Sequence, residues 1–198
     1  MSISDLLTQQ LQGGAIRQIA GQIGADEGST GKALSAALPL LMGAMAANAG
    51  SQDGATSLAG ALDRDHDGSI LDNIGGLLSG AAQSPGNGIL KHLLGNKRSA
   101  VEQQVSAVSG LNLQSVSQLL MIVAPMVMGV VGKTKRQQGL DVGGLASMLA
   151  GERQAISDQA GGAAGNMLSS LLDKDGDGDV MDEVGGMLGG LFGAKKKG

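Results

Sequence analysis

The longest apolar run of the chain reads Leu119-Leu120-Met121-Ile122-Val123-Ala124-Pro125-Met126-Val127-Met128-Gly129-Val130-Val131. Its 13 residues fall short of the roughly 20 that a membrane-spanning helix needs. We therefore expect a buried helix in this stretch. Pro125 predicts a kink in it, because proline removes a backbone donor and clashes with the preceding helical turn.

An earlier stretch aligns with this run after a shift of 86 residues, without a gap. Pro39-Leu40-Leu41-Met42-Gly43 falls on Pro125-Met126-Val127-Met128-Gly129, and Gly24 falls on Gly110. Internal similarity at a fixed spacing is typical of repeat proteins. The sequence therefore predicts two divergent tandem helical repeats, with Pro39 and Pro125 at equivalent kinks.

The repeats define the expected domain organisation. Apolar residues recur at helical spacing throughout, and no segment alternates like a strand, so the predicted fold class is all-α and multihelical. An inserted segment at about 133–162 holds a further helix capped by Asp141. The expected segments are a first repeat at 1–80 with an acidic loop at 63–72, a linker with a short helix at 81–98, and a second repeat at 99–198 with an acidic loop at 173–182.

Each predicted repeat ends in a D-x-D-x-D-G-x-x-x-D loop, and ten of the eighteen acidic residues lie in these loops or at Glu183. Alternate aspartates direct carboxylate oxygens to one side of a tight loop, and the glycine permits the sharp turn. Such oxygen-rich loops predict a Ca²⁺ ion, in preference to Mg²⁺, which takes fewer carboxylates and more water. The predicted metal ligands are Asp63, Asp65, Asp67, Ser69 and Asp72 in the first loop and Asp173, Asp175, Asp177, Asp179 and Asp182 in the second.

These loops are EF-hand-like but shorter than an EF-hand. An EF-hand loop closes with a glutamate at position 12, where this chain has Ile74 and Val184. Asp72 and Asp182, at position 10, take the place of that closing carboxylate. The competing interpretation is that the aspartates and glycines only cap the helices that follow, and hold no metal.

The composition restricts both the core and the chemistry. One phenylalanine is the only aromatic residue, beside 35 glycines and 10 methionines, so we expect aliphatic, methionine and alanine side chains on closely packed helices. The absence of cysteine excludes disulfides and thiolate chemistry and fits a reducing compartment. The start, Met1-Ser2-Ile3-Ser4-Asp5, lacks the basic and apolar regions of a signal peptide, so a cytoplasmic location is expected.

Several motifs occur in a characteristic order: G-A-D-E-G at 24–28, A-A-L-P-L-L-M-G at 36–43, A-G-A-L-D-R-D-H-D-G-S-I-L-D at 59–72, G-I-L-K-H-L-L-G at 88–95, S-A-V-E-Q-Q-V-S-A-V-S-G-L at 99–111 and L-L-M-I-V-A-P-M-V-M-G at 119–129. In this combination the chain resembles the bacterial DUF 937 family, a domain of unknown function. A weaker similarity to YidB-like helical proteins lies in the order helix, G-x-(D/N), helix, proline block. The resemblance implies an all-helical bacterial protein and supplies no activity or catalytic residues.

Two other segments have both a functional and a structural interpretation. Residues 16–37 resemble a helix-turn-helix, but the second helix offers only Lys32, and a net charge of −4 disfavours binding to phosphates. Lys133, Lys135 and Arg136 form a basic cluster that suits either an anionic surface or, as the favoured interpretation, a solvated helix end.

The predicted function follows from these observations. The sequence contains no phosphate-binding loop, nucleophile elbow or zinc-ligand spacing, so we expect no catalytic residues and no enzyme. We expect a soluble structural or interaction protein with two calcium-binding loops. The alternatives are a cation-responsive regulator of a protein partner and, less favoured, a helix-turn-helix-like nucleic-acid binder.

Overall fold

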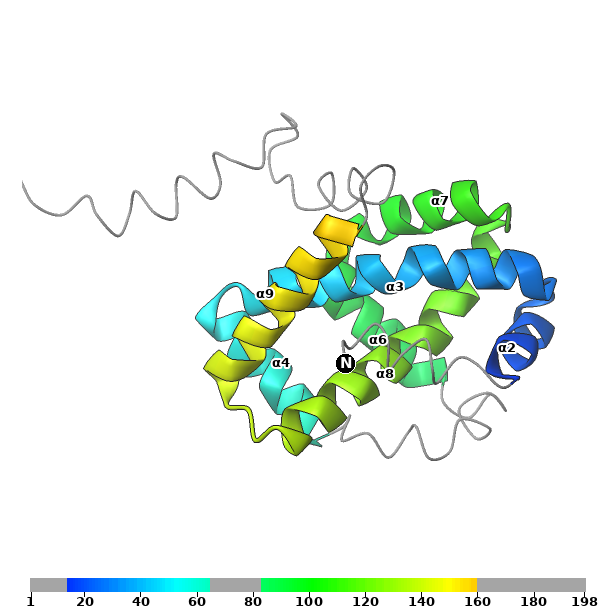
Figure 1. Cartoon of the computed structure of the whole chain (residues 1–198). Helices are drawn as coiled ribbons and strands as arrows, with labels where there is room; N and C mark the ends of the chain where they lie inside the picture. The colour runs from blue at the N-terminus through cyan, green and yellow to red at the C-terminus, as the bar shows by residue number, and fades with distance from the viewer. Residues whose placement is uncertain (1–13, 65–82, 160–198) are drawn as a thin grey trace, which may run out of the picture.

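The computed structural model describes residues 14–64 and 83–159, and the described part contains no β-strand. The all-α prediction is therefore confirmed. The helices are α2 (Ala15–Ile23), α3 (Glu27–Ala49), α4 (Gln52–Arg64), α6 (Gln83–Leu94), the 3-10 turn η3 (Gly95–Lys97), α7 (Arg98–Ser109), α8 (Leu113–Gln137) and α9 (Val142–Gln159), shown in Figure 1.

Two long helices, α3 and α8, form the centre of the fold. Helix α3 packs against α2, α4, α6, α7, α8 and α9. Besides α3, the main partners of α8 are α2, α4, α6 and α7. In Figure 1, α9 crosses α3 near its C-terminal half, while α7 runs beside α3. One continuous hydrophobic core results, and residues from both predicted repeats contribute to it.

The core is built without aromatic side chains in the described part of the chain. The methionines at 42, 45, 126 and 128 are at most 3% exposed, so they fill the core. Each fully buried aliphatic or methionine side chain stabilises the fold by about 1.5–3 kcal/mol. The largest side chains with almost no exposure are Ile19, Leu41, Met42, Met45, Leu62, Leu90, Leu119, Leu120, Met126, Leu145 and Leu149.

The apolar run at 119–131 is the middle of α8, which has 25 residues. The helix is therefore longer than the run suggested, because its ends carry polar residues that the hydropathy pattern did not join to it. By length and composition alone, α3 and α8 are both able to cross a membrane. In the most apolar windows of the two helices, 61% and 83% of the residues are buried within the protein, as in core helices. Pro39 and Pro125 lie inside these two helices.

The two central helices begin in the same way. The Asp26 side chain accepts a hydrogen bond from Ser29 N at 2.8 Å, and the Asn112 side chain accepts one from Ser115 N at 2.9 Å. Each N-cap follows a glycine with a left-handed backbone, Gly24 or Gly110, which ends the preceding helix. The first of these helices begins at Glu27, because Asp26 satisfies its first free N–H groups.

The short helix expected within the segment at 81–98 is α6, which begins at Gln83 and so includes Pro85 in its first turn. Proline fits the first turn of a helix, where its missing N–H has no intrahelical acceptor. Gly86 lies against the Met121 backbone, so the absence of a side chain lets α6 approach α8 closely.

The helix expected within the segment at 133–162 is present as α9. Asp141 Oδ1 accepts a hydrogen bond from Gly144 N at 2.7 Å, which confirms Asp141 as its cap. Leu145 and Leu149 of α9 are fully buried, and the helix packs on α3 and α4.

Replacing Gly86 should test the close contact between α6 and α8. A Cβ atom on Gly86 would overlap the Met121 carbonyl oxygen, so Gly86→Ala should lower the free energy of unfolding by about 1–3 kcal/mol. Gly88→Ala is the matched control, because a Cβ there meets no atom within 4 Å and alanine favours the helix. Urea unfolding of both variants measures the difference. Equal stabilities would contradict the packing of α6 on α8.

The two caps should differ in their response to pH. The hydrogen bond from Ser29 N–H lowers the pKa of Asp26 below its ordinary value. The ionised cap therefore stabilises the fold above the unfolded pKa of roughly 3.9, and this contribution disappears as the pH falls through the lower folded pKa. Unfolding measured from pH 7 to pH 2 should show the advantage of wild type over Asp26→Ala shrinking in acid.

Asn112→Ala provides the control, since Asn112 does not titrate. It should cost about 1 kcal/mol at every pH where the protein folds. A pH-independent effect of Asp26→Ala would show that the charge of its carboxylate contributes nothing to the cap.

Candidate functional site

The structure locates one of the ten predicted metal ligands. Asp63 lies in the last turn of α4, one residue before the helix ends at Arg64. The other predicted ligands lie outside the described residues: Asp65, Asp67, Ser69, Asp72, Asp173, Asp175, Asp177, Asp179 and Asp182. Among residues 14–64 and 83–159, no group of three or more His, Asp or Glu side chains is gathered in a way that could hold a metal ion.

Asp63 forms an ion pair with a residue 72 positions later in the chain. Lys135 Nζ lies 2.7 Å from Asp63 Oδ1, and the exposed fractions of the two side chains are 11% for Lys135 and 52% for Asp63. Arg136 also donates to the Asp63 backbone oxygen, at 3.3 Å. Positive charge stabilises this end of α4, where the last carbonyl groups have no intrahelical donors.

The basic cluster predicted at the end of α8 therefore has an internal role. Lys135 is mostly buried against α4, whereas Lys133 and Arg136 are exposed. The solvated helix end that we favoured describes Lys133 but is wrong for Lys135. Local sequence patterns contain little signal for this pair, because the two partners belong to different halves of the chain.

A surface groove lies between α4 and α6, and we call it the His92 groove. It consists of three hollows of about 290, 160 and 540 Å³, and His92 of α6 lines all three. Thr56, Ser57 and Arg64 of α4 form one side of the widest hollow. The smallest hollow is mostly apolar, and Leu58, Ile89, Leu93 and Met128 contribute to its lining.

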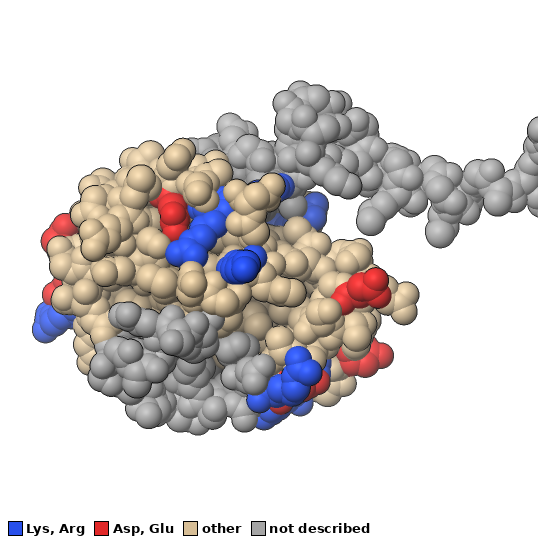
Figure 2. All heavy atoms as spheres, turned by 180° about the vertical axis from the view of Figure 1, so that it is seen from behind, with Lys and Arg blue, Asp and Glu red and all other residues tan. Residues whose placement is uncertain are grey.

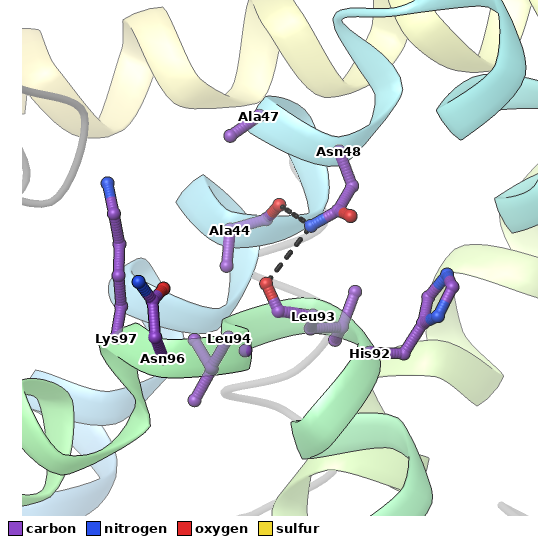
Figure 3. A pocket seen from close by; sticks show the side chains of 9 residues that line it. Ala44, Ala47, Asn48, His92, Leu93, Leu94, Asn96 and Lys97 are labelled. Atoms are coloured by element: carbon purple, nitrogen blue, oxygen red, sulfur yellow. Dashed lines mark hydrogen bonds between the residues drawn. The ribbon is translucent and has the colours of Figure 1, made fainter. Parts of the chain in front are cut away.

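One asparagine fixes the end of the groove where α3 meets α6. Asn48 Nδ2 donates to the backbone oxygens of Ala44, at 2.8 Å, and Leu93, at 3.0 Å. The second bond satisfies a carbonyl in the last turn of α6 that has no donor within the helix. Figure 3 shows Asn48 between His92 on one side and Asn96 and Lys97 on the other. Sequence reasoning missed Asn48, although a polar residue in the last turn of an apolar helix is a signal for such a contact.

The groove has a basic rim. Its charged or ionisable lining residues are Arg64, His92 and Lys97, and no Asp or Glu among the described residues lines these three hollows. The face shown in Figure 2 is largely uncharged, with basic and acidic side chains in small groups. An apolar floor below a basic rim is suited to bind an amphipathic segment that carries carboxylates.

The helix-turn-helix-like segment corresponds to α2 and the first part of α3. Thr30, Ala33, Leu34 and Ala37 face the core, so this part of α3 leaves Lys32 as its exposed basic residue. This arrangement agrees with a pair of core helices, as the sequence had favoured.

The comparisons with known proteins identify the family. Residues 5–134 match the family model described as "Bacterial protein of unknown function (DUF937)". The match spans the helices from α2 through most of α8, and it ends before Lys135, α9 and the second acidic loop. No curated protein and no solved structure matches the chain. The resemblance seen in the sequence motifs is thus confirmed, and the chain belongs to the DUF937 family of bacterial proteins.

Proposed function

We propose that this DUF937 protein is a non-enzymatic interaction protein, built from two related helical units, whose two acidic loops bind Ca²⁺. The position of Asp63 carries the proposal. This first carboxylate of the first loop lies at the end of α4, a helix anchored in the core by Ala55, Leu58 and Leu62. A cation bound at 63–72 would therefore be fixed to the rigid part of the protein.

Local structure supports the relation between the two units. Three pairs of residues are each 86 positions apart in the two units. They are the glycines that end α2 and α7, the N-cap residues of α3 and α8, and the serines whose backbone N–H groups donate to those caps. Pro39 and Pro125 share this spacing within α3 and α8. The packing is also reciprocal, because α2 and α7 each pack on both central helices. A single duplication of one helical unit accounts for all of these equivalences.

The chemistry of the loops supports Ca²⁺ as the ion. Each loop offers five oxygen-bearing side chains, and Ca²⁺ takes six to eight oxygen ligands, the remainder coming from backbone carbonyls or water. The second loop carries more negative charge than the first, which contains Arg64 and His66. We infer that the second loop binds more tightly.

The ion pair of Asp63 favours a second candidate, a cation-responsive regulator. Lys135 Nζ already lies 2.7 Å from the carboxylate that the first loop would offer. An ammonium group and a Ca²⁺ ion on one carboxylate repel each other, so binding at this loop would weaken the contact between α4 and α8. Cation binding and the packing of α4 would then be coupled, and a partner that touches α4 would respond to Ca²⁺.

Isothermal titration with Ca²⁺ tests the proposed function. Wild-type protein should bind two ions, and Asp175→Ala combined with Asp177→Ala should remove the tighter of them. Asp53→Ala is the control, because Asp53 is an exposed carboxylate of α4 outside both loops. The assignment of the second loop fails if the double variant titrates like wild type.

The double variant also isolates the first loop for a test of Lys135. In that background, Lys135→Met should raise the affinity for Ca²⁺ about fivefold, equivalent to about 1 kcal/mol, because the competing charge is lost while the packed stem is retained. Lys133→Met, an exposed lysine on the same helix, should change it less. Equal effects of the two substitutions would exclude competition by Lys135 and leave only a general charge effect.

A further inference from the structure

We propose that the His92 groove is the docking site for the acidic C-terminal segment of the same chain, residues 173–192. The groove lies between α4 and α6, two helices that lack extensive contact with each other, above Met128 of α8. Its surface offers an apolar floor and a basic rim. The following features of the segment match that surface.

Charge complementarity selects an acidic occupant. Arg64, His92 and Lys97 line the groove, and none of its three hollows has an acidic lining residue in the described part of the chain. Asp53 lies on α4 about one turn before Thr56, beyond the lined part of the helix. Residues 173–183 carry six carboxylates and one lysine, the densest negative charge in the sequence. Opposite charges on the two surfaces steer the segment to the groove and fix its orientation.

Apolar spacing provides the second match. Val180, Val184, Met187 and Leu191 are separated by four, three and four residues, the spacing that places side chains on one face of a helix. Leu58, Ile89 and Met128 lie at the floor of the groove, and small residues such as Gly60 and Ala61 leave room above it. An amphipathic helix binds to a groove of this kind through such a row of anchors.

The chain is long enough for the segment to reach the groove. Helix α9 ends at Gln159, and the 13 residues from 160 to 172 can span at most roughly 45 Å. A folded body of about 130 residues has a radius of gyration of about 14 Å, so this tether exceeds its diameter. Tethering also raises the local concentration of the segment to the millimolar range, so that weak contacts suffice for docking.

Docking of this segment would connect the groove to the proposed function, because Ca²⁺ would then control the docking. This control by Ca²⁺ rests on the proposed Ca²⁺ binding at residues 173–182. The carboxylates that would face Arg64 and Lys97 are the ones that would hold the ion. Bound Ca²⁺ neutralises them and thereby weakens their attraction to the rim. The groove would then be open to an external acidic partner when Ca²⁺ is present.

Disulfide trapping tests the docking, because the natural chain has no cysteine to interfere. Full-length protein with Ala61→Cys and Val184→Cys, kept in chelator, should form an intramolecular disulfide about tenfold faster than the control pair Ala150→Cys and Val184→Cys. Ala150 is exposed on α9, the helix from which the segment leaves, so an undocked segment would reach it at least as easily. Adding Arg64→Glu to the first pair should slow its reaction.

Three results would overturn the proposal: equal rates for the two pairs, a rate that Arg64→Glu leaves unchanged, or products that join two chains. The last result would assign the groove to a second copy. Trapping in chelator tests the docking alone. Repeating it with Ca²⁺ separates the docking hypothesis from the hypothesis that the second loop binds Ca²⁺. Faster trapping at Ala61 that Ca²⁺ does not alter would support docking while counting against Ca²⁺ binding at the second loop.

Discussion

The structure depends on a core that must be filled almost without aromatic side chains. Leucine, valine, methionine and alanine side chains are smaller, so helices have to lie close together to exclude water. The contact of Gly86 with the Met121 backbone is one result of this constraint. Another is that α3 and α8 bury residues around much of their circumference, and therefore need other helices on several sides.

The helices that cover this pair also create the surfaces with functional potential. Helix α4 contributes Asp63, which pairs with Lys135 of α8, and Arg64 of the His92 groove. Helix α6 presents His92, and Asn48 holds its C-terminal turn against the end of α3. A change in the position of α4 would thus affect the first acidic loop and the groove together. This shared element connects cation binding to partner binding in the proposed function.

Local patterns in the sequence were sufficient to predict the all-α class and most helices. The apolar runs marked α3 and α8, and Asp141 correctly marked the start of α9, because apolar spacing and N-caps are properties of neighbouring residues. The same reasoning did not explain Gly86 of α6, because its close approach to the Met121 backbone is a tertiary contact that composition does not register. It missed the pairing of Asp63 with Lys135 and the role of Asn48, since both depend on contacts between distant segments. For the acidic loops, the structure describes one of the predicted ligands, Asp63, and shows its ion pair with Lys135.

Native-state hydrogen exchange can test whether α3 and α8 form one core shared by both halves of the chain. Amides in the middle of α3 and α8 should be the slowest to exchange, with the same opening free energy, equal to that of global unfolding. Amides of α2 and α4 should exchange through smaller local openings. A shared core is excluded if α3 exchanges together with α2 and α4 while α7 and α8 stay protected, because the halves then open as independent units.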